Sequence, residues 1–279
     1  MKKSISYWSF EGGLEGKKGI KECFEEAKNY NFDAVELCVS EKGELGLDVS
    51  KEKCEKILKD ANDVGIEISS LATGLYWDYS LTDDNPEIVE KAKQITKKIL
   101  QIANWLKLDT VLVVPGAVDV FFKPDFKTVS YDIVYKRSLK VLKQLSEEAK
   151  KNNVCIGIEN VWNKFLLSPL EMRDFIDKIN SKYVKAYFDV GNVLLFGYPE
   201  QWIRILGKRI KRVHLKDFKK SIGTVDGFCD LTEGDVNWKE VIKAFKEIGY
   251  DSYLTAEMIP YKLGLLEKTS KALDKILSD

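Results

Sequence analysis

Four side chains that can bind a metal ion each stand at or near the end of a short β-rich run in the second half of the chain. They are Glu159 in GIENVW, Asp189 in YFDVGN, His214 in RVHLKD and Glu257 in LTAEM. Three carboxylates and one imidazole form a mostly hard ligand set, which suits Mn²⁺, Mg²⁺, Co²⁺ or Zn²⁺ with positions left open for substrate oxygens. We expect one divalent ion here, with Mn²⁺ as the first choice.

Each of these residues also has a plainer interpretation. An acid that ends a strand can cap the next helix, as Asp189 can, and a lone histidine is more often structural than a ligand. However, Glu159 and Glu257 lie in otherwise apolar runs, where a buried carboxylate without a partner is costly. His214, the only histidine of the chain, stands opposite three such acids. One shared ion would relieve all four side chains, so the pattern favours the metal.

The four residues can meet only in a fold whose successive strands end at the same edge. Eight β-rich runs alternate with longer segments of helical period, and no glycine-rich or proline-rich linker separates them. The predicted strands are Ser4–Phe10, Ala34–Val39, Glu67–Ala72, Thr110–Val114, Val154–Glu159, Val184–Asp189, Arg212–Lys216 and Tyr253–Met258.

Helix-start signals follow several of these strands. Ser50 is a candidate N-cap, and Asn85-Pro86 and Ser168-Pro169 each open a helical run. Eight strand–helix units predict a single (β/α)8 TIM barrel over residues 1–279, with its active groups at the carboxyl ends of the strands. A doubly wound open sheet is the alternative. Its nucleotide-binding versions are disfavoured, because the first strand is not followed by G-x-G-x-x-G and no G-x-x-x-x-G-K-[ST] spacing occurs.

Composition limits the partners. The 44 Lys and Arg residues balance 44 Asp and Glu residues, so no overall field attracts nucleic acid or an anionic membrane. The five cysteines are scattered without a C-x-x-C pair, and no stretch approaches about 18 apolar residues. We therefore expect a cytoplasmic protein with free thiols and a small-molecule partner, without nucleic acid or membrane; a homo-oligomer is compatible with the sequence.

The order E-N, D-V-G-N, H-L-K-D and A-E-M at the last four barrel strands resembles the xylose-isomerase-like superfamily of sugar-phosphate isomerases and epimerases. The likeness runs over essentially the whole length and includes the strand-two acid Glu36. It implies that Glu159, Asp189, His214 and Glu257 bind the metal and that Glu159 and Glu257 are also the acid/base pair. The chemistry agrees, because epimerisation beside a ketone needs a base, a cation that stabilises an enediolate, and an acid on the opposite face.

Within this superfamily the chain looks most like the L-ribulose- and L-xylulose-5-phosphate 3-epimerases. Asn192 stands where the free-ketose tagatose and psicose epimerases share a histidine, so the resemblance favours a ketose phosphate such as a pentulose 5-phosphate. No phosphate site is evident, since Lys219 and Lys220 are equally typical of a solvated loop. The expected substrate-binding residues are Asn192, Lys216, Asp217, Trp8, Trp162 and Glu36.

Some of these assignments have structural alternatives. Lys216 and Asp217, in the H-x-K-D element, are expected to bind substrate or to orient His214, and the alternative is a surface ion pair. The aromatic residues that follow the strands are expected to form a wall against the sugar, although core packing would also explain them. They are Tyr7, Trp8, Tyr76, Trp77, Tyr79 and Trp162.

Other functions share parts of this pattern. A free-ketose 3-epimerase, an aldose–ketose isomerase and an inosose-type dehydratase all begin by removing a proton beside a carbonyl. An abasic-site endonuclease has a similar barrel but needs a histidine-rich cluster of several metals, which a single histidine and a zero net charge disfavour. A non-catalytic sugar-binding protein is the non-enzyme alternative, and the intact ligand set counts against it.

Overall fold

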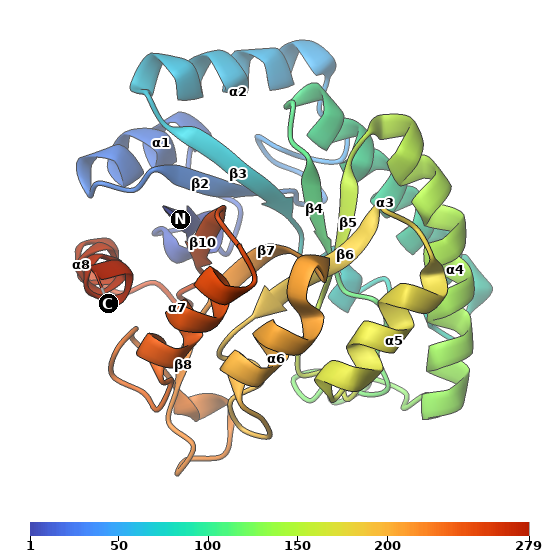
Figure 1. The fold of residues 1–279 in the computed structure, drawn as a ribbon. Coiled ribbons are helices and arrows are strands. Elements are labelled where there is room, and N and C mark those ends of the chain that lie inside the picture. Colours follow the sequence, from blue (N-terminus) through green and yellow to red (C-terminus); the bar gives the residue numbers. More distant parts are fainter. Residues whose placement is uncertain (279) are drawn as a thin grey trace.

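The computed structural model describes residues 1–278, and its centre is a closed barrel of eight parallel strands ringed by eight helices (Figure 1). The barrel strands are β1 (Lys2–Ser6), β2 (Ala34–Cys38), β3 (Glu67–Ala72), β4 (Thr110–Val113), β5 (Cys155–Glu159), β6 (Val184–Asp189), β7 (Ile210–Leu215) and β10 (Tyr253–Ala256). The helices are α1 (Ile20–Asn29), α2 (Lys51–Val64), α3 (Pro86–Trp105), α4 (Tyr131–Asn152), α5 (Pro169–Ile179), α6 (Pro199–Leu206), α7 (Trp238–Glu247) and α8 (Leu265–Ser278).

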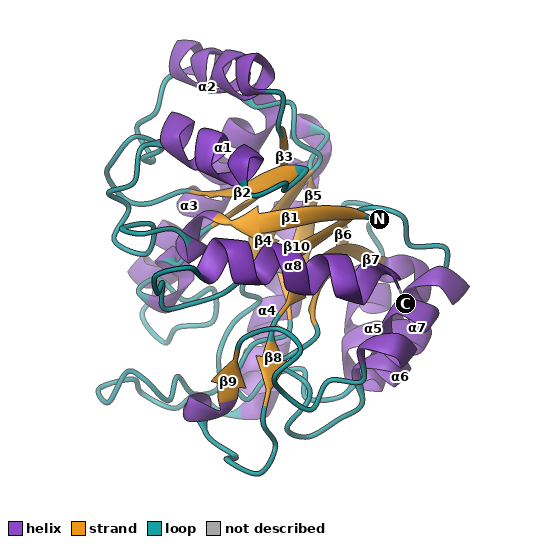
Figure 2. Cartoon of the chain, turned by 90° about the vertical axis from the view of Figure 1, so that its left-hand side faces the viewer, coloured by secondary structure: helices purple, strands orange, loops and turns teal. Residues whose placement is uncertain are grey.

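Two further strands lie outside the barrel. β8 (Asp217–Phe218) and β9 (Phe228–Cys229) pair antiparallel beyond the carboxyl end of β7 (Figure 2). They hold the long connection between β7 and α7 against the end of the barrel from which the predicted site residues project.

The barrel closes because the first and last strands pair in register, with Lys2 beside Tyr253. This confirms the predicted (β/α)8 fold, and the alternative of an open doubly wound sheet is wrong. Among the described residues, no helix is both long and apolar enough to cross a bilayer.

The helices begin where the predicted signals stand. The Ser50 hydroxyl accepts from the Lys53 backbone N–H at 3.2 Å, and Asn85 and Ser168 cap α3 and α5 in the same way. Pro86 and Pro169 occupy the first helical positions, where no N–H is needed. Gly65 ends α2 with φ of 73°, a left-handed conformation that glycine adopts without strain.

The end of the first strand is where the predicted elements differ most from the structure. Ser4–Phe10 was expected to be extended throughout, but β1 ends at Ser6 and residues Tyr7–Ser9 form a 3₁₀ turn. The Ser6 hydroxyl accepts from the Trp8 backbone N–H and so closes this turn. The last strand likewise ends at Ala256, so Glu257 stands one residue beyond it.

The strand register brings polar side chains together inside the carboxyl end of the barrel. Ser6 lies beside Glu36, Glu36 beside Ser70, and Asp189 beside His214. The interior of a TIM barrel is normally filled by branched apolar side chains from its strands. A polar interior at this end therefore indicates a site rather than a core.

Candidate metal centre

The structure brings the four predicted ligands into one buried cluster at the carboxyl end of the barrel. Glu159 ends β5, Asp189 ends β6, His214 lies in β7, and Glu257 follows β10. One ligand atom from each lies within 4.8 Å of the others, and all four residues are buried. Three carboxylates buried this closely repel one another unless a cation lies among them.

His214 is held between two groups of carboxylates. Its Nε2 lies 2.8 Å from Glu36 Oε1, while Nδ1 faces Glu159 Oε1 at 3.1 Å and Glu257 Oε2 at 2.9 Å. If Nε2 carries the proton and donates it to Glu36, the Nδ1 lone pair points into the cluster and can bind a metal ion. A single Nδ1–H could not serve both glutamates fully, so a shared cation satisfies this arrangement better.

Glu36 is itself fixed by two hydroxyl groups. Its Oε2 accepts from the Ser70 hydroxyl at 2.9 Å and from the Tyr187 hydroxyl, and its side chain is fully buried. A carboxylate behind a metal-binding histidine sets the tautomer and orientation of the ring and increases its basicity. Glu36 therefore has the geometry of a positioning residue for His214.

Lys216 adds one positive charge to the cluster. Its Nζ lies 2.5 Å from Asp189 Oδ2 and also contacts Glu257 Oε2. Burial alone would lower the pKa of Lys216, but Asp189 and Glu257 outweigh it and hold that pKa above its usual range. One ammonium against four carboxylates, Glu36 included, leaves a net negative charge that a divalent ion would offset, so these residues fit such an ion.

The two glutamates differ in their proton affinity. Burial raises the pKa of Glu159, and the neighbouring His214 offsets this only in part. Burial would also raise the pKa of Glu257, but Lys216 and His214 outweigh it and hold that pKa below its usual range. Two carboxyl groups with opposite shifts are the pattern of an acid/base pair.

Asn160 joins the ends of β5 and β6. Its side chain donates to the Asp189 carbonyl at 2.8 Å and accepts from the Asp189 backbone N–H at 2.9 Å, while its carbonyl accepts from the Asn192 amide at 3.0 Å. Trp162 Nε1 in turn donates to the Asn192 carbonyl at 2.9 Å. These bonds explain why an asparagine follows Glu159, a role that the sequence alone did not reveal.

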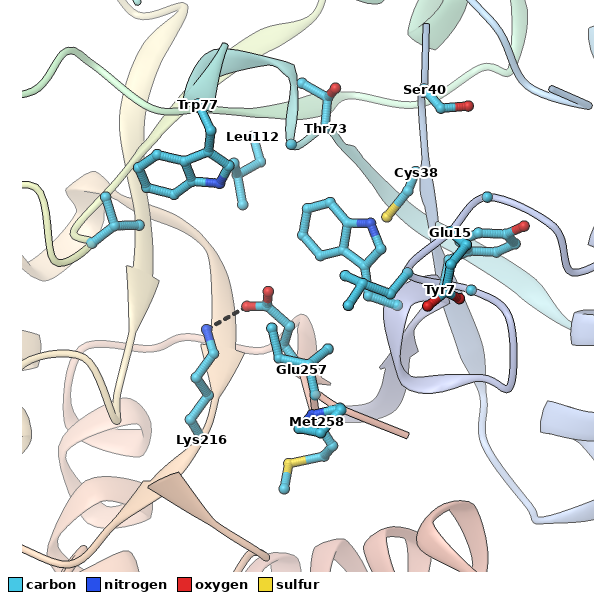
Figure 3. Close-up of a pocket in the computed structure, with 18 of the residues that line it drawn as sticks. Tyr7, Glu15, Cys38, Ser40, Thr73, Trp77, Leu112, Lys216, Glu257 and Met258 are labelled. Carbon is cyan, nitrogen blue, oxygen red and sulfur yellow. Dashed lines mark hydrogen bonds and ion pairs between the residues drawn. The ribbon is translucent and has the colours of Figure 1, made fainter. Parts of the chain in front are cut away.

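A cavity of about 890 Å³ opens onto the cluster. Its wall includes Glu159 and Glu257 but neither Asp189 nor His214, which are fully buried beneath. Figure 3 shows the ion pair of Lys216 and Glu257 projecting into this space, with Trp77 on another wall. Of the predicted substrate-binding residues, the cavity wall contains Trp8, Trp162, Asn192 and Lys216.

Two predicted substrate-binding residues lie elsewhere. Glu36 is buried behind His214, away from the cavity wall. Asp217 is also fully buried, and it accepts from the backbone N–H groups of Phe218, Thr232 and Val236 and from Trp238 Nε1. The donors all come from the loop between β7 and α7 or from the start of α7, so the Asp217 carboxylate fixes the path of that loop.

The structure also decides some of the structural alternatives. Lys216 and Asp217 do not form a surface ion pair, since both are shielded and each has other partners. Tyr76 is core packing, with its hydroxyl 2.9 Å from that of Thr96. Lys219 and Lys220 are exposed and lie off the cavity wall.

Several aromatic residues of the cavity were missed from the sequence. Phe121 and Phe122 line it from the loop after β4, and Phe228 lines it from β9. The adjacent FF pair after the fourth strand is a signal that could have identified Phe121 and Phe122, because large apolar side chains on an exposed loop indicate a binding surface.

Comparison with known proteins agrees with this geometry. The chain is 24% identical over 246 residues to the uncharacterized protein MJ1311 of Methanocaldococcus jannaschii, covering 86% of this chain and 79% of that one. It is 24% identical over 238 residues to the "Putative L-ribulose-5-phosphate 3-epimerase SgbU" of Escherichia coli K12, covering 83% and 81%.

Among solved structures, the D-psicose 3-epimerase of Clostridium cellulolyticum H10 with D-tagatose superposes with a TM-score of 0.80 at 17% identity, over 100% of this chain and 99% of that one. The fold is thus that of a ketose 3-epimerase. The model of the xylose isomerase-like TIM barrel family matches residues 24–277. This chain therefore belongs to the xylose isomerase-like TIM barrel family.

Proposed function

We propose that this protein is an isomerase that epimerises a ketose at carbon 3, using one divalent metal ion held by Glu159, Asp189, His214 and Glu257. One observation carries the proposal. Of the four ligands, only Glu159 and Glu257 reach the cavity wall, and these are the two that the reaction needs as acid and base. The names of SgbU and of the psicose epimerase support the same class of reaction.

Glu159 and Glu257 would serve as the acid/base pair at the cavity wall. One carboxylate would remove the proton beside the ketose carbonyl, and the other carboxyl group would return a proton to the opposite face. In the reverse reaction the two exchange roles. The divalent ion would supply Lewis acidity that stabilises the negative charge developing on the substrate oxygens.

The other residues of the wall position the substrate. Lys216 keeps Glu257 turned towards the cavity through their ion pair. Trp8 and Trp162 offer flat apolar surfaces that can pack against a sugar and exclude water from the reacting carbon. We propose Mn²⁺ as the ion, because three carboxylates and one imidazole leave positions for two substrate oxygens.

The resemblance implies a substrate phosphate, which would need a cation on the cavity wall. Asn192 and the name of SgbU favour a ketose phosphate. Against this, both lysines on the cavity wall are already paired, Lys216 with Asp189 and Glu257, and Lys262 with Asp230. We therefore propose the reaction at carbon 3 without a phosphate requirement.

A labelling experiment tests the proposal. The Mn²⁺-loaded protein is incubated in deuterated water with ketoses and ketose phosphates, and products are analysed by NMR. Deuterium at carbon 3 together with the 3-epimer is the expected result. Label at carbon 1 or 2 with an aldose product would instead identify an isomerase, and a dehydrated product would identify a dehydratase.

Two variants complete the test. Glu159→Gln and Glu257→Gln should each lower exchange at carbon 3 by at least about 100-fold, which is the usual contribution of a positioned acid or base. Glu67→Gln is the matched control, since that glutamate is exposed on β3 and pairs with Lys2. If the protein bound no divalent ion and Glu159→Gln exchanged as fast as wild type, the catalytic assignment would be wrong.

A further inference from the structure

The cavity is far larger than the sugar that the metal centre would hold. A hexose displaces about six waters of ~30 Å³ each, or roughly 180 Å³. The cavity has about 890 Å³, in the range of sites that enclose drug-sized ligands. A monosaccharide bound at Glu159 and Glu257 would leave most of this space to something else.

Part of the cavity wall is a row of aromatic rings that begins at Trp162, which is bonded to Asn192 beside the metal centre, and ends at Trp77. Neighbouring ring centroids are 5.1 Å apart between Trp77 and Phe122, 5.1 Å between Phe122 and Phe121, and 6.0 Å between Phe121 and Trp162. Phe228 extends the row at 5.3 Å from Trp162. Such a continuous row offers apolar faces for another ring to pack against.

Part of this row lies open at the rim. Phe121 is 50% exposed and Phe122 is 47% exposed, although each ring packs edge-on against an aromatic neighbour. Two adjacent phenylalanine side chains held half in water at the mouth of a deep cavity form an apolar patch of the kind that binds a ligand.

The charge of the wall disfavours an anion. Seven carboxylates and two lysines line the cavity, and no arginine does among residues 1–278. Lys216 and Lys262 are both engaged by acids, and lysines outside the wall pair with Glu44 and Asp78. Glu15 and Asp226 have no lysine or arginine partner within 4.0 Å in the described part of the chain. A phosphate group placed beside them would meet two uncompensated carboxylates, and neither lysine of the wall is free to bind it.

We propose that this cavity takes an uncharged ketose derivative, with the ketose at the metal centre and a second ring, attached to the far end of its chain, packed on the aromatic row. This inference rests on the proposed function for the placement of the ketose, and adds the substrate class. The second ring is a sugar or an aromatic group, since both present apolar faces and no charge.

Four ligands that differ only at oxygen 6 of fructose test this class. They are D-fructose, D-fructose 6-phosphate, 6-O-α-D-glucopyranosyl-D-fructose and 6-O-benzyl-D-fructose. All four have the same carbons 1 to 4, so the groups that would reach the metal centre are identical. Binding to the Mn²⁺-loaded full chain is measured by calorimetry and by quenching of tryptophan fluorescence, because Trp8, Trp77 and Trp162 line the cavity.

We expect the glucosyl or the benzyl derivative to bind on the order of tenfold more tightly than D-fructose, from the apolar area that the second ring buries. D-fructose 6-phosphate should bind more weakly than D-fructose. A gain for only one of the two ring derivatives would identify the kind of ring. Tighter binding of the phosphate, or no gain for either ring, would overturn the inference.

A variant pair locates the second ring. Phe122→Ala should lower the ratio of ring-derivative affinity to fructose affinity roughly threefold or more, whereas Phe196→Ala should leave the ratio unchanged because Phe196 is 84% exposed and lies off the cavity wall. An unchanged ratio in Phe122→Ala would also count against the inference. Measuring deuterium exchange at carbon 3 with the same ligands separates the two proposals: if no ligand exchanges but the binding order holds, only the proposed reaction fails.

Discussion

Replacing Glu36 by glutamine removes a charge behind the metal centre with little change in shape. In the structure, Glu36 Oε1 lies 2.8 Å from His214 Nε2, and Oε2 accepts from Ser70 at 2.9 Å and from the Tyr187 hydroxyl. A glutamine can keep its oxygen on His214 and turn its amide towards the two hydroxyl groups, which can accept as well as donate. The side chain loses its negative charge while its hydrogen bonds are retained.

The expected effect is on metal affinity. A carboxylate behind a histidine ligand raises the basicity of the ring, and removing such a partner typically weakens metal binding by about 10- to 100-fold, or roughly 1.4 to 2.7 kcal/mol. Because glutamine still orients His214, we expect Glu36→Gln to lie near the lower end of this range. Glu36→Ala should fall at or beyond the upper end, since it leaves His214 Nε2 without its acceptor in a fully buried space.

Metal affinity is measured directly, by calorimetry or competition with a coloured chelator, so the readout does not depend on turnover. Glu67→Gln is again the control, and its affinity should match wild type. The melting temperature of each metal-free variant shows whether the fold is retained. If Glu36→Gln bound Mn²⁺ within twofold of wild type, the charge of Glu36 would not act through His214 and the positioning role would be refuted.

Three further outcomes follow from the structure. Removing the metal with EDTA should lower the melting temperature by roughly 5 to 10 °C, since an ion at 100 times its Kd stabilises by about 2.7 kcal/mol; equal melting curves would contradict the site. Gly234→Ala should lower the free energy of unfolding by about 1 to 3 kcal/mol, because the Cβ of the new alanine would lie 2.1 Å from Asp217 Oδ1. In the same denaturant titration Gly74→Ala should lower it less, because the nearest atom to a Cβ at that position is 3.8 Å away. Burial, with a smaller contribution from Asp217, raises the pKa of Cys229 to about 11. Iodoacetamide should therefore modify Cys229 roughly 200-fold more slowly than free cysteine at pH 8, and faster as the pH rises through that pKa. The rate is followed by mass spectrometry, and a rate independent of pH would refute this.

The barrel could be predicted from sequence because its strands are buried on both faces and read as short apolar runs. The bounds of β3 and β6 agree with the prediction to the residue. The end of β1 was wrong because Tyr7, Trp8 and Phe10 are residue types that favour strands. The turn depends on two local hydrogen bonds, from the Trp8 N–H to the Ser6 hydroxyl and from the Phe10 N–H to the Tyr7 carbonyl.

The clustering of Glu159, Asp189, His214 and Glu257 could be predicted because each stands at or beside a strand end, which is a local property of the sequence. The partners of Glu36 were not found, because Tyr187 and His214 lie 151 and 178 residues away along the chain and meet it only when the barrel closes. The bonds of Asp217 are nearer in sequence, at 15 to 21 residues for Thr232, Val236 and Trp238, but they require a loop whose path no residue pattern specifies. Contacts that form only when the barrel closes or the loop folds could therefore not be predicted from the sequence.

Carboxylates influence what can bind at both ends of the cavity. At the inner end, Glu159, Asp189 and Glu257 are buried together beside Lys216 and His214, so a divalent cation bound there would stabilise them. At the outer end, Glu15 and Asp226 have no cationic partner in the described part of the chain and would disfavour an anionic substituent, which would leave the aromatic rings as the favourable contact. The substrate that we propose would suit both ends, because it brings oxygen ligands to the metal and an uncharged apolar surface to the rim.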